Sequence, residues 1–181
     1  MHSIIFNSLA AAGLIFSPIA NADTLNVAVA SNFVSALESI EAAFEASSEH
    51  DIQVIRGSSG KHYAQIVNGA PFDVFMSADQ KRPQLLQEQG AAVSGSLRTY
   101  ALGQLALWSR EEGLILGKNY LLESDNYNVI AIANPRLAPY GQAALEVFEA
   151  LGISQQVNEK IVLGENIAQA FQFAFSGNAS L

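Results

Sequence analysis

Serines at two expected strand-to-helix turns form the arrangement in this sequence that is best suited to chemistry. Ser31 follows a Val-rich run, and the pair Ser58-Ser59 lies between Gly57 and Gly60. A helix N-terminus carries unpaired backbone N–H groups and a partial positive charge, and a serine there adds a hydroxyl donor. Glycines let the backbone approach a ligand closely because they have no Cβ atom. These residues therefore predict a binding site for a small anion.

Helix capping is the simpler explanation of any one of these turns, because serine is a common N-cap residue. For a single turn taken alone we favour the cap. Two such turns in one parallel α/β sheet lie at the same edge, where the strands end and where open α/β folds bind ligands. The turns at Ser31 and at Ser58-Ser59 together therefore favour an anion site, and Ser77 is a weaker third case.

A secreted serine hydrolase is the alternative from a different class of protein. Ser58 or Ser59 would act with His62, which is close enough in sequence to meet Ser58 on one helix. No third partner is apparent, and the segment 57–61 has neither the G-x-S-x-G order of a hydrolase nor the length of a nucleotide-phosphate loop. The three histidines show no metal-ligand spacing. We therefore expect no catalytic residue, no enzyme activity, no cofactor and no metal apart from one carried within the bound oxyanion.

The elements that must position the serines alternate between strand and helix, which is the order of a parallel α/β sheet. Val-rich or alternating runs predict strands, and apolar residues at helical spacing predict helices. Ser31 or Asn32 is expected to cap the first helix. The expected strands are 25–30, 52–55, 72–76, 100–108, 129–133 and 160–163, and the expected helices begin near 33, 63, 79, 142 and 167.

The first 22 residues differ in composition from the rest of the chain. They contain no Asp, Glu, Lys or Arg, include an apolar stretch at about 9–19, and end in the small-x-small sequence at 20–22. This pattern predicts a cleavable signal peptide, and the stretch is short for the alternative, an uncleaved membrane anchor. Because the chain has no cysteine, no lipid can be attached at the cleavage site. We expect a soluble periplasmic protein of a Gram-negative cell, with a signal peptide at 1–22, a first α/β lobe at 23–103 and a second at 104–181.

The amino-acid composition excludes further classes of protein. Hydrophobic residues make up 50% of the chain and charged residues 14%, which argues against disorder. The net charge of −8 lacks the basic balance of a nucleic-acid-binding protein. An acidic protein cannot attract an anion by its overall charge, so selectivity must come from neutral donors held at fixed distances.

Several segments, taken in order and at their natural spacing, resemble the periplasmic molybdate-binding proteins of ABC importers. The similarity begins at Leu25 and is carried by 27–33, 57–61, 69–79, 134–135 with 138–144, and 164–167. The resemblance implies a periplasmic binding protein fold of type II-like form, a two-lobed clamp of α/β lobes with parallel-type sheets. It also implies a monomer that delivers its ligand to the membrane permease of an ABC transporter.

The resemblance further implies the ligand and the residues that hold it. Molybdate or tungstate would be bound by Ser31, Asn32 and Ser59 from the first lobe, and by donors at Tyr140 and Ile167, largely backbone N–H groups, from the second. Sulfate, phosphate, iron or a small organic anion remain alternative ligands for the same architecture.

Members of the resembled family continue beyond the position that matches Leu181. We therefore expect the second lobe of this chain to be incomplete. A natural small domain with a frayed tail is the alternative.

Overall fold

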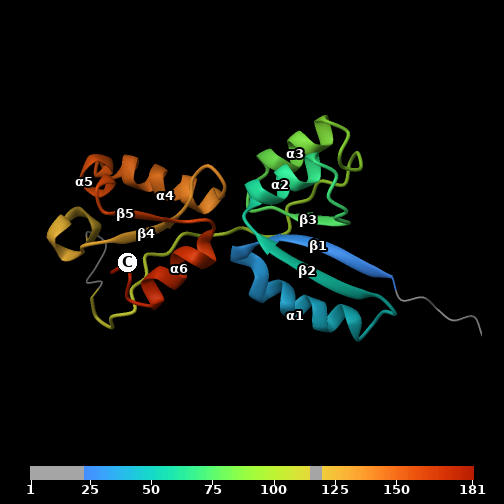
Figure 1. The fold of residues 1–181 in the computed structure, drawn as a ribbon, viewed down its shortest axis with the longest axis horizontal. Coiled ribbons are helices and arrows are strands. Elements are labelled where there is room, and N and C mark those ends of the chain that lie inside the picture. Colours follow the sequence, from blue (N-terminus) through green and yellow to red (C-terminus); the bar gives the residue numbers. More distant parts are fainter. Residues whose placement is uncertain (1–22, 115–119) are drawn as a thin grey trace, which may run out of the picture.

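The computed structural model describes residues 23–114 and 120–181, and the predicted signal peptide lies outside the described residues. Two parallel sheets, each with helices on both faces, lie at the two ends of this part of the molecule and are joined by an extended segment (Figure 1). The α/β class with parallel sheets is thus as predicted. Among the described residues, no helix has the length and apolar character needed to cross a membrane.

The first lobe contains a three-stranded sheet with the order β2-β1-β3. Its register places Ala30 at the end of one strand opposite Gly57 at the end of its neighbour. The turns that carry Ser31 and Ser58 therefore leave the sheet at the same level. The elements are β1 (Thr24–Ala30), the 3-10 helix η1 (Ser31–Phe33), α1 (Val34–Glu45), β2 (Asp51–Gly57), α2 (Ser59–Val67), β3 (Val74–Met76) and α3 (Lys81–Glu88).

The second lobe contains a two-stranded sheet in which Ala133 lies opposite Gly164. Helices follow both strands, so two more helix N-termini start from one edge of this sheet. Leu181 lies against the strand β4, where its carbonyl accepts a hydrogen bond from Ala131. The elements are η2 (Tyr120–Leu122), η3 (Ser124–Asn126), β4 (Ile130–Ala133), α4 (Pro139–Ala150), α5 (Ser154–Asn158), β5 (Ile161–Gly164) and α6 (Ile167–Phe175).

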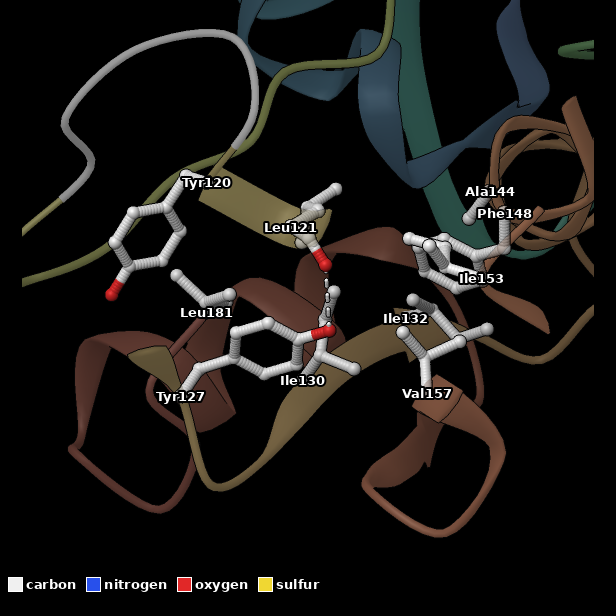
Figure 2. Packing of buried hydrophobic residues seen from close by; sticks show 10 residues of the cluster. All are labelled: Tyr120, Leu121, Tyr127, Ile130, Ile132, Ala144, Phe148, Ile153, Val157 and Leu181. Carbon is white, nitrogen blue, oxygen red and sulfur yellow. Dashed lines mark hydrogen bonds between the residues drawn. The ribbon is translucent and has the colours of Figure 1, made fainter. Parts of the chain in front are cut away.

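Each lobe has its own hydrophobic core. In the first lobe, Val27, Val29 and Leu37 are buried between β1 and α1. The core of the second lobe is larger, and in it the Tyr127 hydroxyl donates to the Leu121 carbonyl at 3.2 Å, so the buried polar atom has a partner (Figure 2). Its buried members are Tyr120, Leu121, Tyr127, Ile130, Ile132, Ala144, Phe148, Ile153, Val157 and Leu181.

Four expectations about the elements were wrong. The helix expected to begin near 63 begins at Ser59, directly after its N-cap residue Ser58. Neither Ser31 nor Asn32 caps α1, because both lie within the 3-10 turn that precedes it. The segment 100–108 forms no strand, since the two described sheets provide it with no ladder partner. The helix predicted from 142 begins at Pro139, a residue whose fixed φ and missing N–H suit the first helical position.

Candidate functional site

A cavity of about 10 Å³ lies between the two lobes. All five residues predicted to bind the ligand line it: Ser31, Asn32 and Ser59 from the first lobe and Tyr140 and Ile167 from the second. Segments separated by more than a hundred positions in sequence thus meet at one place. The other lining residues are Ala30, Gly57, Ser58, Ala78, Ala138, Pro139 and Asn166.

Helix starts surround this cavity. The 3-10 turn before α1 and the first residues of α2, α4 and α6 all contribute to its lining. Each helix start directs unpaired N–H groups and a partial positive charge toward its N-terminal end. Among the described residues that line the cavity there is no Asp, Glu, Lys, Arg or His. The site is therefore positive through backbone dipoles rather than through ionised side chains.

The Ser59 hydroxyl is fixed by the protein in one of its hydrogen-bonding roles. Ser59 is fully buried, and its Oγ accepts a 2.9 Å hydrogen bond from the backbone N–H of Ala78. A hydroxyl has one proton to donate, and accepting from Ala78 leaves that proton available for a ligand. Ser58, by contrast, serves as the N-cap of α2, where its Oγ accepts from the backbone N–H of Lys61.

Ser31 lies where the two lobes meet. Its Oγ accepts a 3.4 Å hydrogen bond from the backbone N–H of Ala168, the second residue of α6. Its hydroxyl proton, like that of Ser59, remains available as a donor. Asn32 is exposed at the rim of the cavity and provides an amide side chain there.

The second lobe provides backbone donors. Tyr140 is the second residue of α4 and Ile167 the first of α6, positions whose N–H groups have no partner within a helix. In the described part of the chain, no protein acceptor is recorded for either amide. The next amides of α6 are occupied, since Gln169 donates to the side chain of the N-cap residue Asn166.

The side chain of Tyr140 runs to the segment that joins the lobes. A Cβ atom added at Gly103 would overlap the Tyr140 hydroxyl, so the ring packs directly on this glycine. Nearby, the Tyr100 hydroxyl donates to the carbonyl of Ser77 at 2.7 Å. Burial raises the pKa of Tyr100, and the neighbouring Tyr140 adds to the shift.

The family profile of the bacterial extracellular solute-binding proteins matches residues 25–181. This chain belongs to that family. The similarity predicted from the motifs is thus confirmed, and the two-lobed arrangement of parallel sheets is the fold of a solute-binding protein.

Relatives of this solute-binding protein include two named molybdate-binding protein ModA. The one from Azotobacter vinelandii is 42% identical over 162 residues, covering 90% of this chain and 64% of that protein. The one from Rhodobacter capsulatus is 45% identical over 152 residues, covering 84% of this chain and 60% of that protein. This chain therefore spans less than two thirds of the length of either relative.

Two solved structures of similar proteins share this fold. The periplasmic molybdate-binding protein of Azotobacter vinelandii matches with a TM-score of 0.83 at 42% identity, covering 86% of this chain and 68% of that chain. A Clostridium difficile domain, named as the substrate binding domain of a molybdenum ABC transporter, matches with a TM-score of 0.63 at 28% identity. That match covers 88% of this chain and 69% of the other.

The hydrolase alternative finds no support in the geometry of this solute-binding protein. The buried His62 ring contacts the carbonyl of Val29 through Nε2 at 3.2 Å and the Gln65 side chain through Nδ1 at 3.1 Å. A carbonyl can only accept, so Nε2 carries a proton and is not a base for Ser58 or Ser59. Burial lowers the pKa of His62, and the two hydrogen bonds oppose that shift.

Sequence reasoning missed two residues that build the site. Asn166 caps α6 and lines the cavity, and the backbone of Ala78 fixes the Ser59 hydroxyl. An asparagine before an apolar helical run is an N-cap signal, so Asn166 was detectable. The contact between Ala78 and Ser59 joins the ends of β3 and β2, and no local pattern reports it.

Proposed function

We propose that this protein binds molybdate or tungstate in the periplasm and delivers it, as a monomer, to the membrane permease of an ABC importer. One observation carries the proposal: five residues from both lobes line one cavity, and that cavity is bounded by helix starts. Ser31 and Ser59 would donate through their hydroxyls, Asn32 through its amide, and Tyr140 and Ile167 through backbone N–H groups. The names of the relatives support the same ligand.

Neutral donors suit a fully ionised tetrahedral dianion. Such an ion needs a hydrogen bond to each oxygen when it leaves water, and bonds to an ionised acceptor are the stronger kind. Phosphate at neutral pH carries a proton and would call for an acceptor, yet no carboxylate lines the described cavity. Sulfate, like molybdate, carries no proton and differs from it mainly by its smaller size, so the measured affinities must distinguish the two.

Calorimetric titration tests the proposal directly. The chain is titrated with molybdate, tungstate, sulfate and phosphate, and we expect tight binding of the first two. The paired variant Ser31→Ala with Ser59→Ala should lose this binding, because each hydroxyl bonded to a charged group contributes about 1.5–3 kcal/mol.

The matched control replaces two exposed serines of the first lobe. Ser39 and Ser47 bond backbone carbonyls in and just after α1, away from the cavity. The paired variant Ser39→Ala with Ser47→Ala should bind as the unmodified chain does. If the chain binds none of the four anions, the proposed function is wrong.

A further inference from the structure

The turn between β4 and α4 presents its carbonyl groups to the first lobe. Within the turn, the amides of Leu137 and Ala138 donate to the carbonyl of Asn134 at 3.0 and 2.8 Å, and the amide of Arg136 donates to the Asn134 side chain at 3.0 Å. The N–H groups of the turn are thus satisfied internally. The carbonyls of Arg136 and Leu137 accept instead from residues of the other lobe.

Two donors of the first lobe meet these two successive carbonyls. The amide of Gly60 donates to Leu137 O at 2.7 Å, and Nη2 of Arg82 donates to Arg136 O at 3.2 Å. A Cβ atom at position 60 would lie 2.8 Å from Leu137 O, so this approach requires glycine. Both contacts join protein atoms directly.

Arg82 is held in place before it reaches across. Its Nη1 forms an ion pair with Oδ2 of Asp79, and the other oxygen of Asp79 accepts from the backbone of Arg82 at 3.0 Å and from the hydroxyl of Ser77 at 3.1 Å. Only 18% of the Arg82 side chain and 21% of the Asp79 side chain are exposed. The guanidinium is therefore fixed on the first lobe, and little side-chain entropy remains to be lost when it bonds the second.

We propose that Arg82 is a positioning residue for the oxyanion site. Arg82 does not itself line the cavity. The turn that it holds ends at Ala138, the N-cap of α4, and the two residues that follow, Pro139 and Tyr140, line the cavity. By fixing Arg136 O while Gly60 fixes Leu137 O, Arg82 aligns the Tyr140 amide with the donors of the first lobe. This inference rests on the proposed function of the cavity.

A second inter-lobe pair provides a contrast. Nζ of Lys61 lies 3.1 Å from Oε1 of Glu165, but the two side chains are 50% and 42% exposed. Exposed pairs of this kind contribute little. Arg82 differs because it is partly buried, makes two contacts with Asp79 and donates to a backbone carbonyl.

The positive charge of Arg82 is a competing explanation for an effect on binding. A guanidinium near the cavity attracts an anion even if it forms no hydrogen bond to Arg136. Two variants separate the explanations. Arg82→Gln removes the cation and its bond to Arg136, and leaves Asp79 unpaired. Adding Asp79→Asn removes one charge of each sign, so the net charge returns to that of the unmodified chain while the bond to Arg136 stays absent.

The test measures molybdate dissociation by stopped flow, with the fluorescence of Trp108, the single tryptophan, as the signal. We expect Arg82→Gln to release molybdate about tenfold faster with little change in the association rate, because the lost bond acts once the lobes meet. The double variant should release molybdate as fast as Arg82→Gln does. Arg56→Gln is the matched control, because Arg56 pairs with Glu38 at 2.5 Å within the first lobe and lies at an exposed position.

Hydrogen exchange without ligand keeps this test independent of the proposed function. The Gly60 amide, which donates to Leu137, should exchange faster in Arg82→Gln than in the unmodified chain or in Arg56→Gln. Unchanged exchange at Gly60, unchanged molybdate release in Arg82→Gln, or full recovery of slow release in the double variant would each overturn the role of Arg82. If the unmodified chain binds no oxyanion while the exchange difference is present, the proposed function fails and the positioning of the turn stands.

Discussion

The hydroxyl oxygen of Ser59 accepts a 2.9 Å hydrogen bond from the backbone nitrogen of Ala78, which ties the start of α2 to the turn after β3. This bond sets the direction in which the hydroxyl can donate. Ser59→Ala should therefore weaken molybdate binding about 10- to 150-fold, the equivalent of one hydrogen bond to a charged group of about 1.5–3 kcal/mol. Calorimetric titration measures the change.

Ser58→Ala is the control for Ser59→Ala, because the two serines are adjacent and equally buried. The Ser58 hydroxyl caps α2 by accepting from Lys61. Its loss should lower the free energy of unfolding by about 1 kcal/mol and leave binding less affected than Ser59→Ala does. Equal losses of affinity in both variants would contradict the separate roles of cap and ligand donor.

The buried His62 should make stability depend on pH. Burial lowers the pKa of His62 in the folded protein below its ordinary value of 6.5. Below pH 6.5 the unfolded chain then binds a proton that the folded protein does not, so stability is full above pH 6.5 and is lost as the pH falls. Urea unfolding between pH 5 and pH 7.5, the range in which histidine titrates, measures this loss.

His62→Gln should flatten that dependence on pH, because the variant retains a polar side chain and removes the titrating group. His50→Gln serves as the control, since His50 is exposed and changes the histidine count equally. A slope that His62→Gln leaves unaltered would show that other groups cause the loss of stability in acid.

The predictability of the site follows from the register of the sheets. Parallel strands that end together must direct the following turns to one edge, and Ala30 does lie opposite Gly57. Local sequence patterns were therefore enough to predict that Ser31 and Ser59 lie at one cavity. The boundary between lobes at 103 and 104, and the ligand roles of the lining residues, stay predictions.

What the sequence did not reveal depends on contacts between distant segments. An apolar run such as 100–108 resembles a strand, but a strand exists only when a neighbour pairs with it, and the described sheets provide none. The bond from Arg82 to Arg136 O joins two lobes through a backbone carbonyl. Since every residue has a carbonyl, no residue type at 136 could have indicated it.

The ring of Tyr140 should matter less to the ligand than its amide. Because the hydroxyl packs on Gly103, Tyr140→Phe should change molybdate affinity by less than about threefold, well under the effect of losing a hydrogen bond to a charged group. Gly103→Ala should have the larger effect, since its methyl group would displace the ring and the start of α4 with it. A loss of affinity in Tyr140→Phe as large as that in Ser59→Ala would instead make the phenol a direct ligand.

Ile167→Pro removes one backbone donor from the cavity while leaving the helix intact. Ile167 is the first residue of α6, where proline is well tolerated because its N–H has no helical partner. The preceding residue, Asn166, has φ −144° and ψ 176°, an extended conformation of the kind that a residue before proline adopts. We expect molybdate binding to weaken about 10- to 150-fold, with the free energy of unfolding within about 1 kcal/mol of the unmodified chain. Ile167→Ala, which also shortens the side chain but keeps the amide, should bind nearly as the unmodified chain does, so equal losses in the two variants would assign the effect to packing rather than to the N–H group.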